Sequence, residues 1–198
     1  MKIDFLPERI ELCKLIIARD SMDGVAEASG LALAMKIDHT HPLYKPLHDT
    51  IVSSYGRAFT EMRPLGKLSP KWFRFGDTEL EKAHEMLMYY RHKNVSHTEV
   101  IESRVLLYPK GAKISKNITA TNVQYGVLYQ TFAPSELIAV QKLAGNIAGR
   151  LIAEIERLMH IIYGENGIYL SEITDVITDT ELAQLEASRK KTNKKQSR

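Results

Sequence analysis

An arginine and a histidine near the middle of this chain have types and a spacing that suit phosphate chemistry. The run Tyr89–Glu99 reads Y-Y-R-H-K-N-V-S-H-T-E, and Arg91, Asn94 and His97 follow one another at steps of three. In a helix each of these residues is rotated by about 60° from the one before, so the three share an arc roughly 120° wide. Polar groups gathered on a helix built for burial cost desolvation free energy unless something uses them.

The two ends of that arc have complementary chemistry. Arginine carries a permanent positive charge and a planar fork of donors that suits a phosphate. Histidine titrates near neutral pH and can take or give a proton. Arg91 and His97 are therefore sufficient in principle to cleave RNA without a metal, because the histidine can remove the 2′-hydroxyl proton while the arginine stabilises charge on the phosphate. The same pair also suits a helix C-terminus, where cations favour the helix dipole, so the spacing leaves both interpretations open.

The motif and its surroundings resemble a known superfamily. Arg91-His92, followed after the arginine by five residues and then His97, resembles the HEPN signature, in which an Arg is followed after four to six residues by a His. The second position of that signature is commonly Asn, Asp or His. The run 90–97 is similar to the "R-N-K-x-x-A-H-S" phrase of bacterial HEPN-like proteins, with Ser96 where that subgroup often has Ala. Ser54–Phe59, S-Y-G-R-A-F, is similar to the "S-Y-x-R-x-F" phrase of the preceding helix, and the resemblance covers roughly residues 43–163.

The resemblance implies a helical bundle that dimerises and brings two Arg–His motifs together. Many HEPN proteins are metal-independent ribonucleases of toxin–antitoxin or phage-defence systems, whereas others are inactive binding or regulatory modules. By this resemblance His97 is the general base, Arg91 stabilises the transition state, and His92 and Asn94 position the substrate or the catalytic pair. Neither a metal nor another cofactor is expected. The expected partners are a second copy of the chain, RNA, and an antitoxin or other partner protein.

A second hypothesis, from a different functional class, is a non-catalytic helical module. Such a module would dimerise and bind a nucleotide, RNA or a protein partner. Tyr55 and Arg57 are candidates for substrate binding under either hypothesis, because with Arg63 they can line an arginine-rich pocket beside the motif. The alternative is that Tyr55 packs inside the bundle while Arg57 pairs with Glu61, four residues further on. We favour a structural role that also shapes the site.

Two other clusters have a structural alternative to a functional one. His39, His41 and His48, with Asp38 and Asp49, contain metal-ligating side chains, but their spacing matches no known ligand pattern, and a polar turn before a helix explains them more simply. Trp72, Phe73 and Phe75 beside Lys71 and Arg74 suit a stacking platform for single-stranded nucleic acid. Such a cluster more often anchors a long loop on the core.

Periodicity predicts a mainly α fold, a HEPN-like helical bundle with a small appended β-hairpin. Apolar residues at steps of three and four, with their breakers and caps, predict helices over residues 6–18, 25–37, 43–59, 77–97, 134–163 and 179–190. Residues rich in Val, Ile, Thr and Tyr predict two or three short strands in Arg104–Pro109 and within Ala112–Phe132. The long apolar stripe of 134–163 suits the core first, and its Gly145 and Gly149 would also suit a dimer seam.

Composition limits the class of protein. The 198 residues, 44% hydrophobic and 26% charged, predict one globular domain over residues 1–188, with a β insertion at about 103–132. The single cysteine, Cys13, excludes an internal disulfide framework and a cysteine-based zinc site. No apolar run is long enough to span a membrane and the N-terminus does not resemble a signal peptide, so we expect a cytoplasmic protein without membrane contact.

Charge is unevenly distributed along the chain. The last ten residues, Arg189–Arg198, hold six of the 27 basic residues and no acid, and we expect them to form a basic flexible tail. Residues 1–188 then carry a net charge of about −3. The folded body is therefore not a basic nucleic-acid-binding domain in bulk. Any attraction to phosphate must come from the tail or from a local patch.

Overall fold

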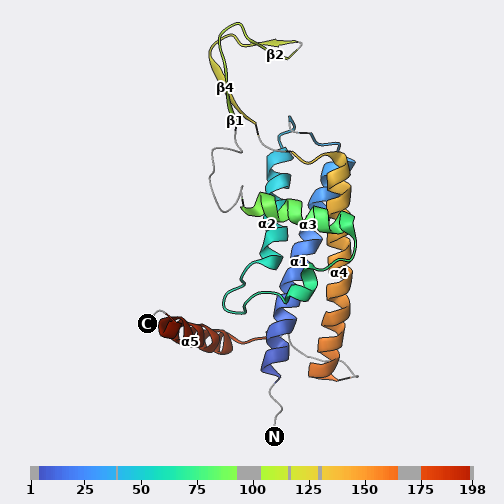
Figure 1. The fold of residues 1–198 in the computed structure, drawn as a ribbon, viewed down its shortest axis with the longest axis vertical. Coiled ribbons are helices and arrows are strands. Elements are labelled where there is room, and N and C mark those ends of the chain that lie inside the picture. The colour runs from blue at the N-terminus through green and yellow to red at the C-terminus, as the bar shows by residue number, and fades with distance from the viewer. Residues whose placement is uncertain are drawn as a thin grey trace.

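The computed structural model describes residues 5–38, 40–92, 104–115, 117–128, 131–164 and 175–196. Within these ranges it is mainly helical, with a two-part β-hairpin inserted between the third and fourth helices (Figure 1). The helices are α1 (Leu6–Ala34), α2 (Tyr44–Phe59), the short 3-10 helix η1 (Pro70–Phe73), α3 (Thr78–Tyr90), α4 (Pro134–Tyr163) and α5 (Asp179–Gln196). The strands are β1 (Arg104–Tyr108), β2 (Lys113–Ser115), β3 (Ile118–Thr119) and β4 (Gln124–Leu128).

The two longest helices, α1 and α4, pack against each other in the bundle. They run side by side in opposite directions, and α2 lies along α1 (Figure 1). The predicted bounds of α4 are confirmed, and its apolar stripe faces the core, where Val140, Ile147 and Leu151 are fully buried. Gly145 and Gly149 are exposed on the opposite face, and no other part of the described chain lies within 4 Å of a β-carbon built at either position. The stripe is thus core, while the two glycines line an open helix surface.

The first helix differs from the prediction. The sequence predicted separate helices over 6–18 and 25–37, whereas α1 continues through residues 19–24 without a break. Ser21 and Met22 are buried inside this segment, and the Ser21 hydroxyl donates to the carbonyl oxygen of Ile17. Gly24 lies where α2 approaches, with Ser54 Oγ 3.7 Å from a β-carbon built there. Packing against neighbouring helices outweighs the weak helix propensity of these residues.

Helix α3 begins at a well-defined cap. Asp77 is its N-cap, and its carboxylate accepts hydrogen bonds from the backbone N–H groups of Glu79 and Leu80. The helix was predicted to reach His97. It ends at Tyr90, and Arg91 and His92 continue it as a wider π turn. Residues 93–97 lie outside the described ranges.

The β insertion is a single bent hairpin, confirming the predicted appendage. Strand β1 pairs antiparallel with β4, and β2 pairs antiparallel with β3 nearer the tip. At the bend, Gly111 adopts a φ of +88° and its N–H donates to the carbonyl oxygen of Ala120. We call Arg104–Leu128 the hairpin arm, because it projects beyond the end of the helix bundle (Figure 1).

The C-terminal helix extends further than predicted. Helix α5 continues to Gln196 rather than to about Lys190, so most of the segment expected to be a flexible tail is helical. It points away from the bundle axis (Figure 1). Arg9 of α1 holds its first turn through Glu181, and Arg189 holds its second half through Glu61 and the carbonyl oxygen of Pro64. Among the described residues, no helix is both long enough and apolar enough to cross a membrane.

Candidate functional site

Arg91 and His92 lie at the end of α3, where the helix widens. The backbone N–H of Arg91 bonds to the carbonyl oxygens of Leu87 and Met88, and the π turn then carries the chain to His92, whose side chain is exposed. Such turns re-aim side chains and are frequent at functional sites. The other two members of the predicted arc, Asn94 and His97, lie outside the described residues. The structure therefore places the arginine half of the motif.

The Arg91 side chain lies directly against the backbone of α2. A β-carbon built on Gly56 would lie 2.3 Å from Arg91 Cδ and 2.6 Å from both Cγ and Nε. Real β-carbons never come so close to another heavy atom, so the arginine can occupy this place only because residue 56 has no side chain. The motif arginine and the middle of the S-Y-G-R-A-F run are thus in contact, although 35 positions separate them in the chain.

Tyr55, the neighbour of Gly56, fixes α3 from inside the core. Its side chain is fully buried, and its hydroxyl lies 2.6 Å from Nδ1 of His84. Burial raises the pKa of Tyr55 and lowers the pKa of His84, so both groups are held neutral. The tyrosine hydroxyl accordingly keeps its proton, and the hydrogen bond joins two uncharged groups. Tyr55, a candidate for substrate binding from the sequence, instead supports the helix that carries Arg91.

His84 sits in an aromatic cluster that joins three segments. Its ring centroid lies 5.4 Å from that of Phe59, 5.8 Å from that of Phe73 and 5.5 Å from that of Phe75. These contacts pack the loop that follows α2 against α3. Trp72 of the same loop is 4% exposed, beneath Lys71 and Arg150. The aromatic run of this loop anchors it to the core, and the buried tryptophan presents no face on which a base could stack.

Arg57 is the exposed member of the S-Y-G-R-A-F run. The predicted pairing of Arg57 with Glu61 is not formed, because Glu61 binds Arg189 of α5 and lies 3.9 Å from Arg63. The helical geometry of α2 places Arg57 one residue beyond the Gly56–Arg91 contact, with its side chain in solvent. Of the two candidates on α2, Arg57 is the one available to a ligand.

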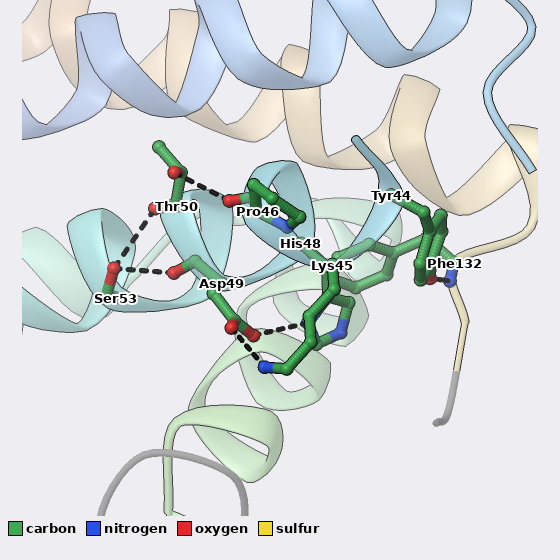
Figure 2. A network of polar contacts seen from close by, with 8 residues as sticks. All are labelled: Tyr44, Lys45, Pro46, His48, Asp49, Thr50, Ser53 and Phe132. Carbon is green, nitrogen blue, oxygen red and sulfur yellow. Dashed lines mark hydrogen bonds and ion pairs between the residues drawn. The ribbon is translucent and has the colours of Figure 1, made fainter. Parts of the chain in front are cut away.

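A second aromatic cluster holds the end of α3 from the other side. Figure 2 shows His48 of α2 against Phe132, which precedes α4; their ring centroids are 4.7 Å apart. Tyr90, directly before Arg91, meets both rings edge-on, at 5.6 Å from His48 and 5.2 Å from Phe132. The hydroxyl of Tyr44 accepts a hydrogen bond of 2.9 Å from the backbone N–H of Phe132. The cluster fixes the position of the residue that leads into the motif.

His48 is a buried neutral histidine. Its Nδ1 lies 3.5 Å from the Asp49 carboxylate, and its Nε2 is buried without a hydrogen-bond partner among the described residues. Burial lowers its pKa, and this effect outweighs the raising influence of Asp49. Asp49 is already bound to Lys45 at 2.5 Å (Figure 2). Among the residues that the structure describes, no group of three or more His, Cys, Asp or Glu side chains could hold a metal, and His39 lies outside them.

A shallow pocket of about 380 Å³ lies elsewhere, between the first half of α3 and the start of α4. Lys82, Met86 and Glu136 are among its lining residues. None of Arg91, His92, Tyr55 or Arg57 lines it. The pocket is therefore separate from the end of α3.

The structure thus brings together Arg91, Gly56 and, through His84, Tyr55, and it leaves Arg57 and His92 exposed nearby. The role of Gly56 was not predicted. The only sequence signal for it was its place within the S-Y-G-R-A-F run, where the matching phrase leaves this position variable. Comparisons with protein-family models, with curated proteins and with solved structures gave no match to this chain.

Proposed function

We propose that the protein is a metal-independent HEPN-like endoribonuclease of a toxin–antitoxin or phage-defence type. The observation that supports this most directly is the close packing of the Arg91 side chain against Gly56. An arginine whose stem is held by Gly56 has less conformational freedom to lose when its guanidinium binds a phosphate. The π turn at the same residue adds a local distortion of the kind found at functional sites.

In the proposed reaction, His97 takes the proton of a ribose 2′-hydroxyl. The 2′-oxygen attacks the adjacent phosphorus, and Arg91 stabilises the negative charge that develops on the phosphate oxygens. The bond from phosphorus to the 5′-oxygen breaks, and this oxygen leaves with a proton from solvent. The products are a 2′,3′-cyclic phosphate and a free 5′-hydroxyl. In the proposal, His92, Asn94 and Arg57 bind substrate around this centre, while Tyr55 acts indirectly by holding α3.

A homodimer is part of the proposal, with two motifs facing each other. The exposed surface of α4 around Gly145 and Gly149 supports it, because no described residue comes within 4 Å of a β-carbon built at either glycine from outside its own stretch of helix. Light scattering on a size-exclusion column measures the mass of the purified protein directly. A monomer at all concentrations would remove the dimer from the proposal. An antitoxin or other partner protein belongs to the proposal as well.

The test is cleavage of a labelled single-stranded RNA in EDTA. Arg91→Ala and His97→Ala should each lower the cleavage rate by about 100-fold or more, the usual effect of losing a phosphate-stabilising group or a general base. The matched controls are Arg19→Ala, with an arginine side chain on α1 that is 48% exposed, and His160→Ala, with an exposed histidine on α4. Circular dichroism and thermal unfolding establish that all four variants are folded. Cleavage that survives in both motif variants would contradict the proposal.

A specific observation favours a second function, a non-catalytic module that binds a nucleotide, RNA or a protein partner. The Arg91 stem and its Nε atom are buried against α2, as expected of a residue that secures helix packing. Under this alternative the parent protein cleaves no RNA, and Arg91→Ala lowers the melting temperature. Absence of cleavage in the parent together with a destabilised Arg91→Ala variant would favour the module.

A further inference from the structure

The hairpin arm exposes large apolar side chains. Leu107, which pairs with Tyr125 within the β1–β4 ladder, is 72% exposed, and Val123, which directly precedes β4, is 70% exposed. The two sheets have two strands each, so every strand of the arm is an edge strand with unpaired backbone groups. Isolated two-stranded hairpins are only marginally stable in water. These features indicate a segment whose surface is completed by a partner.

The charge of the arm identifies the chemistry of that partner. Residues 104–128 contain four basic residues and no acidic residue, whereas the rest of residues 1–188 contains 17 basic and 24 acidic ones. Lys110 and Lys113, at the bend and in β2, have exposed side chains. Exposed hydroxyls and amides accompany them at Asn117, Thr119 and Asn122. A cationic ribbon on an acidic body attracts a polyanion locally while the body repels it, which orients the ligand along the arm.

The residue that leads from the arm into α4 packs beside the arginine of the motif. Phe132 follows the arm and packs on Tyr90, and Tyr90 directly precedes Arg91. In the sequence the arm lies between His92, which follows Arg91, and Phe132, which contacts Tyr90, so the chain on either side of the arm leads to the end of α3. A strand bound along the arm would run toward Arg91 and His92.

We propose that the hairpin arm binds the phosphate backbone of single-stranded RNA and guides it to the end of α3. The choice of RNA rests on the proposed function, whereas the anionic character of the ligand rests on the arm itself. Lys110 and Lys113 contact phosphates, and the exposed apolar side chains of Leu107 and Val123 pack against sugars or bases. An acidic protein added along the strand edge would also suit the charge, and the test below separates it from RNA.

The experiment measures binding by fluorescence anisotropy, with a labelled single-stranded RNA and the DNA of the same sequence, in EDTA at several salt concentrations. The arm variant is Lys110→Glu/Lys113→Glu. Its matched control, Lys67→Glu/Lys82→Glu, changes the net charge equally at two exposed lysines of the bundle and its loop. We expect the arm variant to bind RNA at least tenfold more weakly than the parent. Its plot of log affinity against log salt should be shallower by about 0.7 for each lost phosphate contact.

The outcomes distinguish this inference from the proposed catalysis. Arg91→Ala should lose cleavage while keeping most of the RNA affinity, whereas the arm variant should lose affinity. If the parent binds RNA through the arm but cleaves nothing, the arm inference holds and the ribonuclease fails. Equal binding by the arm variant and the control would overturn the inference, as would a parent that binds no RNA.

If the DNA binds as tightly as the RNA, the arm recognises phosphate without selecting RNA, and the choice of RNA is wrong. Light scattering on the same samples tests the protein alternative: an oligomer that the arm variant dissociates would make the arm a protein interface.

Discussion

The side chain of Arg91 occupies the space that a side chain at position 56 would need. The β-carbon of any larger residue there would fall 2.3 Å from Arg91 Cδ, far inside van der Waals contact. Since Gly56 is in the interior of α2, where glycine lowers helix stability, its presence is explained by this contact rather than by local structure. A substitution at position 56 can therefore displace the Arg91 side chain while the arginine itself is kept.

Gly56→Ala should displace the arginine and leave the bundle folded. The new methyl group forces the Arg91 stem out of its seat, while alanine adds about 1 kcal/mol of helix propensity that offsets part of the cost. We expect RNA cleavage to fall at least tenfold, with only a small change in the free energy of unfolding measured by urea titration. Cleavage equal to that of the parent would show that the position of Arg91 is unimportant to activity.

Gly24→Ala is the matched helix-interior control. Ser54 Oγ lies 3.7 Å from a β-carbon built at this position of α1, an ordinary van der Waals contact, so the substitution should raise the free energy of unfolding by about 0.5–1 kcal/mol. Cleavage should be unchanged, because this substitution leaves the Arg91 side chain where it is. Urea denaturation measures the stability of the variant. A loss of cleavage as large as that of Gly56→Ala would show that the loss does not come from displacing Arg91.

Arg91→Met separates the charge of the arginine from its packing. Methionine keeps an unbranched apolar stem to lie against Gly56 but carries no guanidinium. We expect a melting temperature close to that of the parent and cleavage as low as in Arg91→Ala. If Arg91→Met instead cleaves RNA as fast as the parent, the arginine is needed for packing alone.

Tyr55→Phe should destabilise the protein through one hydrogen bond. The substitution removes the hydroxyl that bonds to His84 Nδ1 and leaves this nitrogen without that partner, at a cost of about 1–2 kcal/mol. Tyr163→Phe is the control, because no hydrogen bond of its hydroxyl is found among the described residues. Urea denaturation at pH 8 compares the two. Equal stabilities would show that the Tyr55–His84 bond contributes nothing.

His48 should make the stability of the protein depend on pH. Burial lowers the pKa of His48 in the folded state, while the unfolded chain has the ordinary value near 6.5. Below about pH 6.5 the unfolded state therefore binds more protons, so stability is full above that pH and is lost as the pH falls through the folded pKa.

His48→Phe removes this titrating group and keeps an aromatic ring beside Phe132. Urea denaturation between pH 8 and pH 5 should give a shallower loss of stability than in the parent. Part of the slope remains, because burial also lowers the pKa of His84. His160→Phe, at an exposed histidine of α4, is the matched control for replacing a histidine by phenylalanine. A parent whose stability is constant over this range would show that the histidines titrate alike in both states.

Local sequence was sufficient to predict most of the elements. The steps of three and four in 134–163 gave the bounds of α4, since burial against α1 requires that period. The β-branched and aromatic residues after Arg104 gave the hairpin arm. These features depend on residues that are neighbours along the chain, so the sequence displays them directly.

Tertiary packing decided what local sequence could not. Residues 19–24 of α1 are helical because Ser21 and Met22 are buried by other helices, although Asp23 and Gly24 disfavour a helix locally. The contact of Gly56 with Arg91, the bond of Tyr55 to His84 and the docking of α5 through Arg189 all join residues far apart in sequence. Their formation depends on how the helices cross, which the period of one helix does not contain. The sequence by itself predicted that Arg91 and His92 follow one another near the end of a helix, and only the fold decided that this arginine lies against a glycine of the neighbouring helix.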